Sequence, residues 1–349
     1  MVRDRPFGAI AVSGNELLQV MKSVPIEIVT VDERTVLDRF DLSAIPSESV
    51  RVQLTSVPVP SRLVEVSDWM QSNGLSQLRV YHGKEPINDL EFLQHFPFLT
   101  GFWVDLGRSL RSTAGLRYLG PSLARLGLGS FHRPHATDFV SQLPELETLW
   151  ITGRLDKPER LRELAHLEDL WLNGSAVTSL PDMGVLKSVS ALHLHGGSLA
   201  DLGSLHALPN MQHLEIWSIR GLATFDALGS LPALQVLQVL QVLRLDALSR
   251  LERFPNLSGS TSLRRLHTGT LNTLIDVSAL TSAAALEELV LGLCPRLDPS
   301  ELAVLRRCPR LLRVAVGLNS AKRNAAAAAI LARFDKPEYP PTGATWDEW

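Results

Sequence analysis

The chain lacks several features that would assign it to a specialised class. It has two cysteines in 349 residues, which excludes a disulfide-stapled scaffold and fits a reducing compartment. Its formal net charge is -3 and it has no long basic run, so the electrostatic footprint of a nucleic-acid binder is missing. No run of about 18 apolar residues occurs, and residues 1–20 lack the apolar core of a signal peptide. We therefore expect a cytoplasmic protein with neither a nucleic-acid nor a membrane partner.

Sequence motifs of the common catalytic classes are missing too. The chain contains no G-x-S-x-G, G-x-x-x-x-G-K-[ST], H-E-x-x-H or G-x-G-x-x-G motif. Cys294 and Cys308 have no C-x-x-C spacing and no basic surroundings, so we expect buried packing residues rather than redox groups. These observations predict a protein that is not an enzyme and that needs no cofactor and no metal.

What the chain does contain is a repeat. The pattern L-x-x-L-x-L, with other apolar residues standing for Leu, recurs eleven times at steps of 21–29 residues. Its last two apolar positions lie two residues apart, as one face of a strand requires. The copies begin at Leu75, Leu99, Leu123, Leu146, Leu167, Val189, Met211, Leu234, Leu263, Leu286 and Leu311. One such unit cannot bury its own apolar side, so neighbouring copies must stack.

This repeat resembles the leucine-rich repeat family, over roughly residues 75–320. The middle repeats are similar to the internalin-like class, and residues 289–316 to the cysteine-containing class. The basic residues are mostly arginine, a composition typical of GC-rich bacterial genomes. The resemblance implies an α/β fold: a curved leucine-rich-repeat solenoid with a parallel β-sheet on its concave face.

The two ends differ from the middle, which suggests three segments. Residues 1–74 form an α/β cap or degenerate repeats, residues 75–320 the leucine-rich repeats, and residues 321–349 a helix and an irregular tail. In the first segment, residues 26–31 and 50–56 are predicted strands. Residues 32–40 and 61–72 are predicted helices, with Asp32 and Ser61 as possible N-caps. The alanine-rich residues 321–334 should form a terminal helix that covers the end of the sheet.

One repeat has two possible registers, because Leu234–Leu245 reads LQVLQVLQVLRL. An L-P-x-L sequence precedes several of the predicted strands, and this favours a copy that starts at Leu234. That choice lengthens the repeat to 29 residues. The rival copy starts at Leu240 and leaves a 23-residue step to Leu263. We favour the first. The family also places Asn three residues after the last strand Leu, and here this ladder of turn residues is mostly absent, so irregular repeats are expected.

In this repeat type, the residues between the core leucines point to the concave face. Four of the seven tryptophans take such positions, namely Trp103, Trp150, Trp171 and Trp217. We expect Trp150, Trp171 and Trp217 to be at least partly exposed. Because exposed aromatic clusters mark interaction sites, we predict that these four residues anchor a partner. The alternative is that cross-strand tryptophan pairs only stabilise the sheet.

Polar residues lie beside the tryptophans on the same face. His193, His195, His213 and Glu215 fall near one another and complete the predicted partner-binding surface. Such a cluster can bind zinc, but without a standard ligand spacing we favour a polar rim. The sequence thus predicts a non-enzymatic module that holds a protein partner on a concave Trp/His face. The alternatives are an immunity protein that neutralises a toxin, a delivered effector, a glycan or small-ligand binder, and a metal-dependent enzyme built on the histidines.

Overall fold

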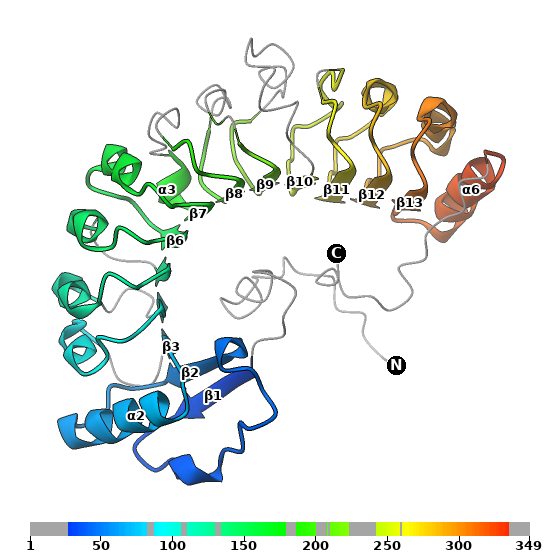
Figure 1. The fold of residues 1–349 in the computed structure, drawn as a ribbon. Helices are drawn as coiled ribbons and strands as arrows, with labels where there is room; N and C mark the ends of the chain where they lie inside the picture. The colour runs from blue at the N-terminus through cyan, green and yellow to red at the C-terminus, as the bar shows by residue number, and fades with distance from the viewer. Residues whose placement is uncertain are drawn as a thin grey trace, which may run out of the picture.

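One parallel β-sheet organises the protein. The computed structural model describes residues 27–81, 87–105, 110–129, 134–178, 186–199, 208, 210–222, 242–258 and 260–334. Within these residues a 13-stranded sheet runs in chain order from β1 to β13, and every neighbouring pair is parallel. The strands line the inside of an arc and the connecting segments form its outside (Figure 1). The predicted curved solenoid is confirmed.

Ten of the eleven predicted repeat copies correspond to strands among β3–β13, and β10 follows the rival copy at Leu240. The strands are β1 (Glu27–Val31), β2 (Val50–Leu54), β3 (Gln77–Tyr81), β4 (Gly101–Asp105), β5 (Arg125–Leu128), β6 (Thr148–Thr152), β7 (Asp169–Asn173), β8 (Ala191–His195), β9 (His213–Trp217), β10 (Val242–Asp246), β11 (Arg265–Thr270), β12 (Glu288–Leu293) and β13 (Arg313–Val316). Their leucines stack in register: Leu170 lies beside Leu149 and Leu192, and all three are fully buried. The ladder of these leucine side chains forms the core, between the sheet and the outer segments of the arc.

Short helices occupy the outside of the arc. Most are 3-10 helices, because repeats of about 23 residues leave little room for full α-helical turns. They are η1 (Leu37–Arg39), η2 (Ser47–Ser49), η3 (Glu91–His95), η4 (Ala114–Tyr118), η5 (Asp138–Gln142), η6 (Pro158–Glu163), η9 (Ser278–Ser282) and η10 (Pro299–Arg307), with a single α-helical turn at α3 (Ser175–Thr178). The described residues include no helix with the length and apolar character needed to cross a membrane.

Longer helices lie near the two ends of the described chain. The N-terminal strands are confirmed as β1 and β2, and α2 (Pro60–Ser72) packs beside them (Figure 1). The N-cap of α2 is Val59 with Pro60 in the first turn, so the prediction of Ser61 as N-cap is wrong. Residues 32–40 contain only the 3-10 helix η1, since the Asp32 carboxylate closes a local turn by accepting from the backbone N–H of Arg34.

At the C-terminal end, α6 (Ala321–Ala332) confirms the predicted terminal helix. It lies beside β13 and contacts η10, so it covers the last strand of the sheet (Figure 1). The predicted irregular tail falls on residues 335–349, which lie outside the described residues.

The register of strand β10 follows the rival copy at Leu240. Strand β10 pairs directly with β9, with Val242 opposite His213 and Arg244 opposite Glu215. Its buried leucines are therefore Leu243 and Leu245, as a copy starting at Leu240 requires. The preference for Leu234 is wrong for this strand, because the 23-residue step keeps the leucine ladder continuous into β11. Residues 223–241 lie outside the described residues.

The turns after the central strands are joined by a backbone ladder. The residue that follows each strand donates its N–H to the carbonyl of the last residue of the next strand: Gly174 to His195 at 2.7 Å, Gly196 to Trp217 at 2.7 Å, and Ser218 to Asp246 at 2.9 Å. These three donors have positive φ angles of 63°, 65° and 54°. This ladder satisfies turn groups without the asparagines of the family pattern, so the ends of these strands stay in register.

Ala247 extends this series of turns and carries strain that a glycine would not. Its φ is 51°, a left-handed value that costs an L-residue roughly 1–2 kcal/mol. Because glycine also loses about 0.5–1 kcal/mol of unfolded-state entropy, Ala247→Gly should raise the free energy of unfolding by up to about 1 kcal/mol. Ala326→Gly, in the exposed middle of α6, is the matched control and should lower it by about 1 kcal/mol. Urea titration of both variants measures whether the free energy of unfolding changes in opposite directions. An equal decrease in both variants would contradict the prediction.

Candidate functional site

The middle residues of the strands form one row along the inner face of the sheet. Parallel pairing places each beside the next, in the order Gln53, Arg79, Trp103, Gly127, Trp150, Trp171, His193, Glu215, Arg244, His267, Val290 and Ala315. Trp103, Trp150, Trp171, His193 and Glu215 share this row as predicted, and the pairing of β10 with β9 adds Arg244 to it. The sequence therefore predicted which residues share this face.

Trp103 shows how the face is packed. A Cβ atom at Gly127 would lie 2.2 Å from the indole Cδ1, and one at Gly101 would lie 2.7 Å from Cη2, so the ring lies flat across both glycines. The guanidinium of Arg51 stacks on the ring at 3.6 Å from its centroid. Burial, together with the like charges of Arg79 and Arg125, lowers the pKa of Arg51 to about 9. The two glycines and the stacked Arg51 guanidinium leave Trp103 only 1% exposed.

The expectation that Trp150 and Trp171 are exposed is wrong. They are 6% and 3% exposed, and with Trp103 they form one buried cluster on the concave side of the sheet. Alternation decides which face a side chain takes, but not whether large neighbours cover it. The indole Nε1 atoms of both residues are buried without a hydrogen-bond partner. Trp217 is half-buried, so only the expectation of its partial exposure is confirmed.

The aromatic row continues into the histidines. The Trp171 and His193 rings stack with centroids 3.5 Å apart and planes 5° from parallel. His195 meets Trp171 edge-on at 5.3 Å and Trp217 edge-on at 5.4 Å. The structure therefore brings the predicted tryptophans and histidines into one continuous set of contacts. His193 and His195 are buried within it, whereas His213 is partly exposed.

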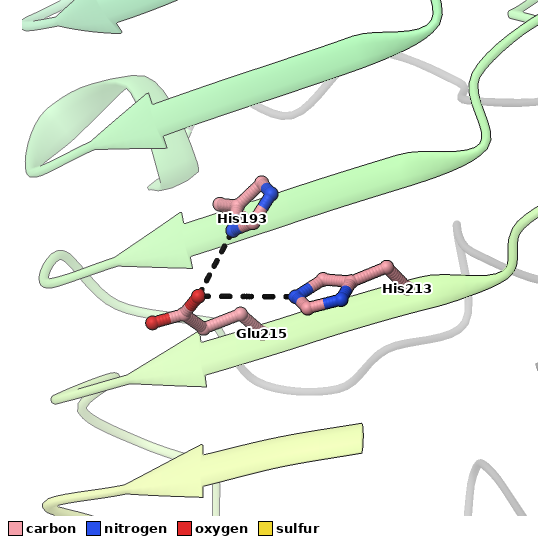
Figure 2. A group of neighbouring side chains, drawn as sticks. All are labelled: His193, His213 and Glu215. Atoms are coloured by element: carbon pink, nitrogen blue, oxygen red, sulfur yellow. Dashed lines mark hydrogen bonds and ion pairs between the residues drawn. The ribbon is translucent and has the colours of Figure 1, made fainter. Parts of the chain in front are cut away.

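Glu215 is the centre of the polar cluster. Its Oε2 lies 3.0 Å from His193 Nδ1 and 4.0 Å from His213 Nε2, and its Oε1 lies 3.2 Å from His195 Nε2 (Figure 2). The other ring nitrogen of His193, Nε2, lies 3.4 Å from the Asp169 carboxylate. All three predicted histidines thus converge on one carboxylate.

These contacts determine the charges in the cluster. Burial alone would raise the pKa of Glu215, but the surrounding histidines, His193 first, lower it well below its usual range. Burial lowers the pKa of His193, yet Asp169 and Glu215 overcome this and raise it overall. Burial keeps the pKa of His213 below its usual value. The centre therefore holds an ionised carboxylate, with a neutral imidazole at its exposed edge.

One accessible part of this face lies at β9 and β10. Every residue of these two strands that faces the inside of the arc is half-exposed, whereas most of those on β6, β7 and β8 are buried. We call this set the open patch; it consists of His213, Glu215, Trp217, Val242, Arg244 and Asp246. Sequence reasoning missed Val242 and Asp246, because the preferred register placed β10 elsewhere. It also missed Arg51, because the repeat alignment began only at Leu75.

Comparison with known proteins gives matches of structure alone. No family model matches the chain, and no curated protein matches it either. A leucine-rich-repeat protein of Leptospira interrogans matches with 18% identity and a TM-score of 0.43, covering 81% of this chain and 82% of that one. A chain of the Toll–Spätzle complex of Drosophila matches with 14% identity and a TM-score of 0.49, covering 83% and 46%. Internalin C2 of Listeria monocytogenes matches with 15% identity and a TM-score of 0.34, covering 72% and 83%.

The chain's own repeat accounts for its fold. Eleven sequence copies, the eighth starting at Leu240, coincide with eleven consecutive strands of one parallel sheet, with their leucines stacked in register. The chain folds as a leucine-rich-repeat solenoid. In this leucine-rich-repeat fold the two cysteines are both buried, as predicted, and Cys294 lies directly after β12.

Proposed function

We propose that this leucine-rich-repeat solenoid is a non-enzymatic module that binds a protein partner through the open patch on β9 and β10. The observation that carries the proposal is the half-exposed Trp217, which stands at the end of a rigid row of buried aromatic rings. Tryptophan is the residue most enriched among interface anchors. A ring held in place by His195 loses little conformational entropy on binding. The scarcity of cysteine supports a cytoplasmic location for this function.

The charges around Trp217 suit a protein partner. Arg244 and Asp246 lie beside it on β10, and His213 and Glu215 lie on its own strand. An aromatic centre with a polar and charged surround is the usual arrangement of a protein interface. Trp103, Trp150 and Trp171 lie on the same face beside the patch, and because they are buried we assign them a supporting role rather than direct contact with the partner.

Trp217→Ala is expected to weaken partner binding by about thirtyfold or more. Anchor residues cost about 2 kcal/mol or more on truncation, and each 1.4 kcal/mol is tenfold in affinity. The immobilised chain and this variant would be compared in capture from a proteome of the source organism, followed by titration of each captured protein. Trp69→Ala is the matched control, because Trp69 lies on α2 against Phe40 and away from the concave face.

The comparison of the two tryptophan variants decides the proposal. A partner of the open patch is lost with Trp217→Ala and kept with Trp69→Ala. If every captured protein binds both variants equally, the open patch is not the binding surface.

A further inference from the structure

Three side chains with metal-binding atoms converge from two neighbouring strands. His193 comes from β8, and His213 and Glu215 come from β9. One ring nitrogen of each histidine and a carboxylate oxygen all lie within 4.8 Å of one another, with the side chains pointing together (Figure 2). Two imidazoles and one carboxylate make a ligand set suited to zinc, which leaves a fourth position open. In the part of the chain that the structure describes, this is the only group of this kind.

The distances are close to those of a coordinated ion. Zinc ligands lie about 2.0–2.2 Å from the metal, so two ligands of a tetrahedral ion lie about 3.3 Å apart. Glu215 Oε2 is 3.0 Å from His193 Nδ1 and 4.0 Å from His213 Nε2. His213 is the ligand that must move, and its side chain is 28% exposed and therefore has room to turn.

Two further polar side chains lie within ion-pair distance of two of the three ligands. Asp169 Oδ1 lies 3.4 Å from His193 Nε2, which leaves Nδ1 directed at the centre. His195 Nε2 lies 3.2 Å from Glu215 Oε1, which leaves Oε2 directed at the centre. A carboxylate behind a histidine is the usual arrangement at metal sites, because it fixes the ring and makes the ligand nitrogen more basic.

A nitrogen without a hydrogen bond points to a missing ligand. His213 Nε2 is buried and makes no hydrogen bond, although Glu215 Oε2 lies 4.0 Å away. Buried polar atoms in native proteins are nearly always paired, and each exception calls for an explanation. An ion between His193, His213 and Glu215 would pair His213 Nε2 directly.

We propose that His193, His213 and Glu215 bind one zinc ion, with Asp169 and His195 as positioning residues. His213 and Glu215 also belong to the open patch, and on the side of β10 Arg244 Nη1 lies 4.0 Å from Glu215 Oε2. A water molecule or a side chain of a partner would supply the fourth ligand. The site shares these residues with the proposed binding surface, but zinc binding by the chain alone needs no partner.

Equilibrium dialysis of the EDTA-treated full chain against Zn²⁺ alone tests the proposal. We expect one ion per chain, and tetrahedral visible absorption when Co²⁺ replaces it. His213→Ala and Glu215→Gln should each weaken zinc binding at least a hundredfold. Asp169→Asn should weaken it about 10–100-fold, the usual effect of removing an orienting partner.

His267→Ala is the matched control. His267 Nε2 lies 2.5 Å from Glu288 Oε1 across β11 and β12, so this pair has the same chemistry without a third metal-binding ligand. Its removal should leave zinc binding unchanged. Because His213 is partly exposed, His213→Ala keeps the core intact and decides the matter even if Glu215→Gln disturbs folding.

Two results would overturn the site. One is a wild-type chain that takes up no stoichiometric zinc, which would make Glu215 only the acceptor of the surrounding histidines. The other is zinc affinity that is equal in wild type, His213→Ala and Glu215→Gln, which would place the ion elsewhere. Neither result bears on the effect of Trp217→Ala on partner capture, so the two proposals fail separately.

Discussion

Leu192→Ala is expected to lower the free energy of unfolding by about 2–5 kcal/mol. Leu192 is fully buried and lies in register between Leu170 and Leu214, so truncation opens a cavity inside the stacked ladder. In a solenoid each repeat is stabilised by its neighbours, so the cavity weakens the interfaces on both sides. Leu170→Ala, one repeat earlier, should have an effect of the same size.

Urea titration followed by circular dichroism measures this loss, and hydrogen exchange of the β7, β8 and β9 amides locates it. The matched control is Leu312→Ala, since Leu312 is 71% exposed just before β13. If Leu192→Ala shifted the midpoint no further than this control, the leucine ladder would not be the core. Exchange that rises only near the substituted repeat would show that the solenoid opens locally rather than as one unit.

The fold was predictable because the repeat specifies it twice. The spacing inside L-x-x-L-x-L defines a strand, and the near-constant distance between copies stacks these strands in order. Local spacing could not determine the register at Leu234–Leu245, because a period of three preserves L-x-x-L after a slip. There the direct pairing of β10 with β9 determines the register. This pairing depends on contacts between repeats rather than on any short stretch of sequence.

The candidate site was predictable in composition but not in exposure. The sequence placed Trp150, Trp171, His193 and Glu215 on one face, and the sheet confirms that they are neighbours. It could not show that the rings lie along the sheet and cover one another. A usable signal was present at Gly127, because a glycine in a row of large residues leaves the space into which a neighbouring ring can lie flat.

Trp171→Ala is expected to cost about 3–5 kcal/mol of unfolding free energy, the range for a large buried aromatic residue. An outward-facing tryptophan would cost far less, and that was the expectation from strand alternation alone. Trp171 is 3% exposed, belongs to the buried cluster with Trp150, and stacks on His193 at 3.5 Å. Its removal therefore leaves a cavity and also frees the His193 ring that faces Glu215.

Trp217→Ala is the matched comparison for this prediction, because Trp217 lies on the same face of the sheet but is half-buried. The melting temperature should fall clearly for Trp171→Ala and much less for Trp217→Ala. The affinity for the partner should fall for Trp217→Ala. Iodide quenching of the native protein should reach Trp217 and spare Trp171. Equal and small losses of stability in both variants would mean that the Trp171 ring faces solvent. The row of aromatic rings would then be a binding surface along its whole length, and the open patch would extend from β9 and β10 back to β7.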